Sequence, residues 1–125
     1  MDSFRAAVEA GDLDAATALL ADDVVFTSPV VFKPYQGKEI TSAILGAVFR
    51  VFEDFRYERS IDDGDDHVLV FHARVGQRSV QGIDLLHTNS DGLIDAFTVM
   101  VRPLSGAHAL QERMAVEFER ISAAG

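Results

Sequence analysis

The hydrophobic residues of this sequence change their spacing near Phe52, from a helical to an alternating pattern, and that change constrains the fold more than any other feature. Between Lys38 and Phe52 they recur every three or four residues, which is the spacing of a helix with one buried face. From Phe55 to Arg102 they alternate with polar residues, which is typical of strands. The sequence therefore predicts one long helix followed by several consecutive strands.

Turn residues divide the alternating region into four strands. We expect these strands at residues 55–61, 68–75, 79–88 and 93–102. Two short helices at 3–10 and 12–21 and a strand at 24–27 come before the long helix, and a last helix carries a buried stripe of Leu110, Met114, Phe118 and Ile121. The predicted fold class is α+β. A curved, mainly antiparallel sheet has helices on one face, in a single domain over residues 1–125.

Charge and composition argue against several classes of partner. The chain has 11 basic and 20 acidic residues, a formal net charge of −9, so its surface repels nucleic-acid phosphates and anionic lipids. No apolar run approaches the roughly 20 residues of a membrane span, and the first residues contain no apolar export signal. The absence of cysteine suits a reducing cytoplasm. We expect a cytoplasmic protein that binds neither nucleic acid nor membrane.

The pattern of histidines and carboxylates predicts no metal and no cofactor. Neither of the histidine spacings with which a helix binds zinc, His-x-x-x-His and His-Glu-x-x-His, is present. The four histidines are His67, His72, His87 and His108. The acidic segment at 62–66 lacks the alternating ligands and distal glutamate of a calcium loop, and a solvated hairpin tip explains it. No glycine-rich nucleotide motif is present.

Asp84 interrupts an apolar strand, so the face on which it lies matters for function. A three-residue connection at 76–78 would place Asp84, His72 and Arg74 on one face of the sheet. The same face is expected to carry Phe97, Val99 and Val101. The other face is expected to carry Phe71, Ile83, Leu85, Thr98 and Met100.

The environment of Asp84 decides its chemistry. In a dry cavity, desolvation raises the pKa of the carboxyl group, which can then act as a neutral donor or general acid, whereas a nearby His72 or Arg74 would lower that pKa. His72 beside Asp84 would form an acid–base pair, and Arg74 could hold an anionic ligand. Each residue also has a structural alternative: a partnered carboxylate, an interior histidine and an arginine in an ion pair.

The remaining candidates would surround an apolar ligand. Tyr35 precedes the long helix and can either donate to a ligand or pack against the helix. The other candidates, which would line the cavity or fill it, are Phe26, Ser28, Phe97, Val99, Val101 and Met114. The expected partner is a small apolar molecule. Because both faces of the sheet are apolar, we also expect a homodimer through the outer face.

Three segments, AGDLDAATALLADDVVFTSP, PYQGKEI and GIDLLHTNSDGLIDAFTVM, resemble the nuclear transport factor 2-like superfamily, and within it the branch of SnoaL-like polyketide cyclases and ketosteroid isomerases. The resemblance implies a cone-shaped α+β fold, which carries both enzymes and non-catalytic proteins. In ketosteroid isomerase a protonated carboxylic acid stands eight residues before the glycine of the last hairpin, as Asp84 stands before Gly92 here. By similarity, Asp84 faces the cavity.

Other positions depart from the enzymes that the chain resembles. The position of the donating tyrosine in ketosteroid isomerase is Phe4 here, and the position of its general-base aspartate is Ser28. The Asp-Arg-Asp set of limonene epoxide hydrolase would fall on His72, Arg74 and Val99, which lack the carboxylates. Steroid isomerisation by the familiar mechanism is therefore not expected.

The function expected from the sequence is binding of a small apolar molecule in the cone, with cofactor-free acid–base chemistry of the isomerase or cyclase type through Asp84 and His72. One alternative is a non-catalytic ligand-binding or dimerisation module, which the residues at positions 4 and 28 favour. A hydrolase similar to the epoxide hydrolases has less support.

Overall fold

The computed structural model describes residues 1–124 and the side chains of residues 1–120. The helices are α1 (Asp2–Glu9), α2 (Leu13–Thr17), α3 (Lys38–Val51) and α4 (Leu104–Ala124). The strands are β1 (Leu20–Thr27), β2 (Tyr35–Gln36), β3 (Glu53–Asp63), β4 (Asp66–Val75), β5 (Arg78–Thr88) and β6 (Ile94–Arg102). The side chain of Ile121, which the sequence predicts on the last buried stripe, lies outside the described residues.

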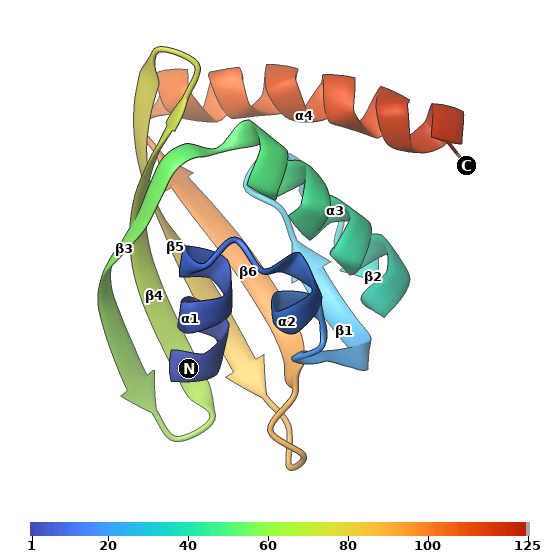
Figure 1. The fold of residues 1–125 in the computed structure, drawn as a ribbon, viewed down its shortest axis with the longest axis vertical. Coiled ribbons are helices and arrows are strands. Elements are labelled where there is room, and N and C mark those ends of the chain that lie inside the picture. The colour runs from blue at the N-terminus through green and yellow to red at the C-terminus, as the bar shows by residue number, and fades with distance from the viewer. Residues whose placement is uncertain (125) are drawn as a thin grey trace.

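The strands form one curved sheet with helices on one side, as the sequence predicts (Figure 1). Within residues 1–124 the strand order is β2-β1-β6-β5-β4-β3, and every neighbouring pair is antiparallel except β1 and β6. Helices α1, α2 and α3 lie over the concave face, and α4 crosses one end of the sheet (Figure 1). The α+β architecture is confirmed.

The predicted long helix is found as α3. It begins after Gly37 and buries Ile44, Ala47 and Val51, which recur at three- and four-residue spacing, together with the adjacent Leu45. It ends at Val51; the next residue, Phe52, has the ψ of 132° of extended backbone, and the chain passes directly into β3. The change of hydrophobic spacing therefore marks the boundary between helix and sheet.

The second helix is shorter than the sequence predicts. Asp12 caps α2 by accepting a hydrogen bond from the Ala15 N–H at 3.0 Å. The helix ends at Thr17, although the apolar spacing continues to residue 21. Leu20 belongs instead to β1, where it pairs with Ile94 and is 1% exposed. Tertiary pairing with β6 thus overrides the local helical pattern.

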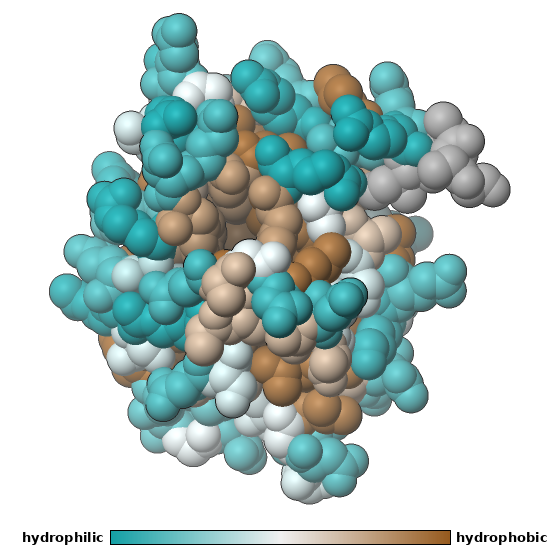
Figure 2. Space-filling model, in the orientation of Figure 1, coloured by the Kyte–Doolittle hydropathy of each residue, from teal (hydrophilic) through white to brown (hydrophobic). Residues whose placement is uncertain are grey.

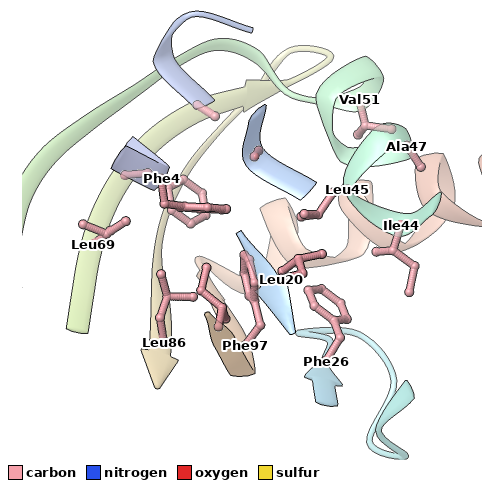
Figure 3. Close-up of a cluster of buried hydrophobic side chains, with 14 of the residues drawn as sticks. Phe4, Leu20, Phe26, Ile44, Leu45, Ala47, Val51, Leu69, Leu86 and Phe97 are labelled. Atoms are coloured by element: carbon pink, nitrogen blue, oxygen red, sulfur yellow. The ribbon is translucent and has the colours of Figure 1, made fainter. Parts of the chain in front are cut away.

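The core joins α1 to the sheet through aromatic rings. Phe4 of α1 meets Phe97 of β6 edge to face, with ring centroids 5.5 Å apart, and the Phe26 ring lies 5.3 Å from the Phe97 ring (Figure 3). Leu20 and Leu86 are buried beside them (Figure 3). This packing fixes α1 across the sheet, so the end of α1 has a defined place above the concave face.

The connection between β4 and β5 is one residue shorter than predicted. Val75 pairs with Arg78, so the turn has two residues, and Gly76 takes the positive φ of 60° that a tight hairpin turn needs. A shift of one residue moves every side chain of a strand to the other face. The prediction that His72 and Arg74 share the face of Asp84 was therefore wrong: Leu69 pairs with Asp84, and His72 pairs with Gln81.

The same shift also changes the face of the Phe71 side chain, which is expected from the sequence on the outer face. It pairs with Gly82 on the concave face and is 1% exposed. The strand β6 keeps its predicted face: Asp84 pairs with Val99 rather than Phe97, a change of two residues, so Phe97, Val99 and Val101 do share the face of Asp84. The outer face carries Ile83, Leu85, Thr98 and Met100, as predicted.

Candidate functional site

A cavity of about 370 Å³ lies between the concave face of the sheet and the helices. Its volume falls within the range of roughly 300–1,000 Å³ that is usual for small-molecule sites. Its wall comes from α1, α3 and α4, from the loops after α1 and β1, and from strands β1 to β6. Figure 2 shows a hollow with hydrophobic walls on the face that carries α1 and α2.

Aromatic rings are prominent in the cavity wall. The chain has nine Phe and two Tyr residues, and every one of them except Phe32 lines the cavity. On the sheet side, the Phe55 ring stacks on Phe71 at 5.0 Å and meets the Tyr57 ring edge to face at 4.9 Å. Gly82 makes room for this cluster, because a Cβ atom there would lie only 2.4 Å from Phe71.

A carboxyl group and a phenol form the polar centre of this wall. Asp84 lies in the middle of β5 and Tyr57 in β3, and each side chain is 6% exposed. The Tyr57 hydroxyl donates a hydrogen bond to Asp84 Oδ2 over 2.7 Å. No other hydrogen bond to the Asp84 carboxyl group occurs among the described residues, so Oδ1 has no protein partner there, in a residue that lines the cavity.

Burial changes the acidity of both groups. Desolvation raises the pKa of Asp84 from 3.8 to about 7, against the opposing effect of the hydrogen bond from Tyr57. Burial, followed by the negative charge of Asp84, raises the pKa of the Tyr57 phenol above its ordinary value, so Tyr57 remains a donor. Near neutral pH a large fraction of Asp84 therefore carries a proton, and its O–H can donate into the cavity.

The solvent-facing edge of the cavity lies at the end of α1. Glu9, Ala10 and Gly11 are exposed and line the cavity there. Arg5 donates from Nε to Glu9 Oε1 at 3.3 Å, and from Nη2 to the Tyr57 carbonyl oxygen at 3.3 Å. The guanidinium of Arg5 thus holds one carboxylate oxygen of Glu9 and leaves Oε2 without a hydrogen bond among the described residues.

His72 and Arg74 lie on the outer face, away from the cavity. His72 Nε2 lies 3.0 Å from Glu58 Oε2, and Arg74 forms ion pairs with Glu53 and Asp54. Neither side chain can reach Asp84, so the predicted acid–base pair does not form. Among the described residues, no group of three or more His, Asp or Glu side chains could hold a metal ion.

Most of the other candidates do line the cavity. They are Phe26, Ser28, Tyr35, Phe97, Val99 and Met114. Val101 packs against the core but is absent from the described wall. Tyr35 packs on Phe118 of α4 with ring centroids 6.2 Å apart, and the Ser28 hydroxyl accepts a hydrogen bond from the Val30 N–H. Ser28 therefore supports the loop at the cavity edge.

Sequence reasoning missed Tyr57, the partner of Asp84. The alternation of Phe55 and Tyr57 with Arg56 and Glu58 was visible and indicates that the two aromatic side chains share a buried face. Its proximity to Asp84 was not visible, because β4 lies between β3 and β5 in the sheet and the register of both pairings had to be known.

Comparisons with known proteins agree with this architecture. A steroid delta-isomerase from Pseudomonas aeruginosa is 43% identical over 98% of this chain and 90% of its own, with a TM-score of 0.92. An uncharacterised bacterial protein with a cystatin-like fold from Silicibacter pomeroyi is 37% identical over 92% of this chain and 82% of its own, with a TM-score of 0.88.

More distant structures share the fold alone. A nuclear transport factor 2-like protein of unknown function from Mesorhizobium loti is 20% identical over 82% of this chain and 88% of its own, with a TM-score of 0.73. A search of curated proteins found no match. Within the described residues, no helix is long and apolar enough to cross a membrane.

The family itself follows from a match that spans most of the chain. The profile of the SnoaL-like domain matches residues 1–97, which include α1 to α3 and the strand that carries Asp84. The sheet order, the cone of helices and the two relatives above 35% identity are consistent with that match. The chain belongs to the SnoaL-like family of the nuclear transport factor 2-like superfamily.

Proposed function

We propose that the protein binds a compact apolar ring ketone and polarises its carbonyl group through protonated Asp84. The observation that carries this proposal is a buried carboxyl group with a pKa of about 7 in the wall of an aromatic cavity. A neutral carboxylic acid donates to a carbonyl oxygen and stabilises the negative charge that develops there when the ketone enolises. This is the acid half of the chemistry of isomerases and cyclases.

Tyr57 supports this role without contacting the ligand oxygen itself. Its hydroxyl is directed at Asp84 Oδ2, which fixes the carboxyl group and leaves Oδ1 as the donor. The steroid delta-isomerase that is 43% identical to this chain makes a carbonyl substrate a natural choice for the test. Phe4 and Ser28 argue for a ligand that differs from the steroid substrate of that enzyme class, because this chain lacks the corresponding donor and base.

Binding of 2-acetylnaphthalene at about pH 6, measured by titration calorimetry, tests the proposal. We expect Asp84→Asn to bind this ketone about tenfold more weakly, because the variant loses the strong acid donor. Asp91→Asn, an exposed aspartate in the turn after β5, is the matched control and should bind like the wild type. Equal affinities for the wild type and Asp84→Asn would refute the contact with Asp84.

Non-catalytic binding is the second candidate function, and the cavity edge favours it. Ser28 occupies the position at which a base is expected by resemblance, and its hydroxyl accepts a hydrogen bond from the Val30 N–H. The same ketone distinguishes the two functions. An enzyme would accelerate deuterium exchange at the methyl group next to the carbonyl, measured by NMR, whereas a carrier would bind the ketone without exchange.

We further propose that the outer face of the sheet forms a homodimer. Four side chains lie side by side on the outer face across β3 to β6: Ile61, Val68, Leu85 and Thr98. Met100 on the same face is 51% exposed. A row of this kind, apolar except for the Thr98 hydroxyl, is typical of an interface.

A charge in the middle of this row should therefore separate the subunits. We expect Leu85→Glu to convert a dimer into a monomer in sedimentation equilibrium, because two carboxylates would be buried against apolar surface. Val116→Glu, at a 55% exposed position on α4, is the control and should remain dimeric. A wild-type protein that stays monomeric at high concentration would contradict the interface.

A further inference from the structure

We propose that the ligand of this cavity carries a basic amine at the end remote from its carbonyl group, where the amine meets Glu9. The inference rests on the proposed function and adds to it the charge and the orientation of the ligand. It depends on three features of the wall: its charged groups, its aromatic rings and the placement of Glu9 at the solvent-facing edge.

The ionisable side chains of the cavity wall are all acids or phenols. Glu9 and Asp84 line the cavity, as do Tyr35 and Tyr57, whereas no Lys, Arg or His does so among the described residues. A carboxylate ligand would lose its hydration here without gaining a cationic partner, which is costly. The cavity therefore disfavours anions and accepts a neutral or cationic molecule.

Of a neutral and a cationic ligand, the aromatic wall favours the cationic one. Every aromatic residue except Phe32 lines the cavity, so a ligand is surrounded by ring faces and edges. A protonated amine within about 6 Å of a ring centroid gains from the negative face of the ring, and more so where water is excluded. Phe49 and Phe52 of α3 lie partly exposed in the wall and supply such rings.

Glu9 gives the amine a partner and fixes the direction of the ligand. It is exposed at the end of α1, whereas Asp84 is buried in the middle of β5, so the two carboxyl groups mark an outer and an inner end. Arg5 donates from Nε to Oε1 of Glu9 and from Nη2 to the Tyr57 carbonyl oxygen, and it does not line the cavity. The second oxygen of Glu9 is the one that an amine would contact.

Three ketones that differ in one substituent test the inference. Each is 2-acetylnaphthalene with an aminomethyl, hydroxymethyl or carboxyl group at the far ring position. At about pH 6 the amine is protonated and the acid is ionised. We expect the amine to bind the wild-type protein about tenfold more tightly than the alcohol, and the carboxylate to bind at least about tenfold more weakly than the alcohol.

Two variants assign the preference to the outer end of the cavity. Glu9→Gln should reduce the advantage of the amine over the alcohol to about threefold or less, since the rings alone then remain. Glu112→Gln, an exposed glutamate on α4, is the control and should keep the full advantage. Asp84→Asn should weaken all three ketones by the same factor, because it acts at the common carbonyl end.

The possible failures are distinguishable. If unsubstituted 2-acetylnaphthalene binds but the amine has no advantage over the alcohol, this inference is wrong and the proposed function stands. Tightest binding of the carboxylate would also overturn it, as would an amine preference that persists in Glu9→Gln. If neither the unsubstituted ketone nor any of the three derivatives binds, the proposed function is wrong as well.

Discussion

The affinity for 2-acetylnaphthalene should be constant below about pH 6 and should fall about tenfold for each pH unit well above 7. The ketone does not titrate in this range, so the change in affinity arises from a titrating group of the protein. Burial raises the pKa of Asp84 to about 7, and only the protonated carboxyl group can donate to the carbonyl oxygen. Titration calorimetry between about pH 5 and about pH 9 measures the profile.

Two variants identify the titrating group. Asp84→Asn stays neutral throughout, so its weaker affinity should not change with pH. Tyr57→Phe removes the hydrogen bond that lowers the pKa of Asp84, so its profile should move to higher pH than that of the wild type. A Tyr57→Phe profile that moves to lower pH, or a wild-type affinity that is independent of pH, would contradict the assignment of the donor.

The fold could be predicted because its main signals are local and periodic. The change of hydrophobic spacing at Phe52 fixes where α3 ends and β3 begins, and glycines at positions 64, 76 and 92 mark the turns between strands. The prediction failed at residues 18–21, where apolar spacing continues after α2. Leu20 joins the sheet there because it pairs with Ile94, which is 74 positions away in the chain.

The candidate site could be predicted only in part, because the face of a strand depends on the length of each turn. One residue fewer between β4 and β5 removes His72 and Arg74 from the cavity and brings Phe71 into it. Asp84 escaped this error, since its facing was inferred by resemblance. Tyr57 lies two strands away from Asp84, and no local pattern reports a contact across an intervening strand.

The raised pKa of Asp84 also predicts that the site weakens the fold as the pH rises. Between pH 3.8 and about 7 the carboxyl group is ionised in the unfolded chain but protonated in the folded one, so the folded state binds more protons. Its contribution to the free energy of unfolding therefore falls as the pH rises through this range, by up to roughly 4 kcal/mol in total, and changes little above it.

Asp84→Asn should remove this loss, because a neutral amide fills nearly the same space and can still accept the hydrogen bond from Tyr57. We expect the variant to be more stable than the wild type by a few kcal/mol at about pH 8 and nearly equal to it at about pH 4.5. Urea unfolding at intermediate pH values measures the difference between the free energies of unfolding of the two proteins. Exposed groups that titrate, such as Glu58 and His87, contribute equally to both proteins, so their contributions cancel in this difference. A difference that does not grow with pH would mean that Asp84 is already ionised in the folded protein, and the buried acid would then be lost as a donor.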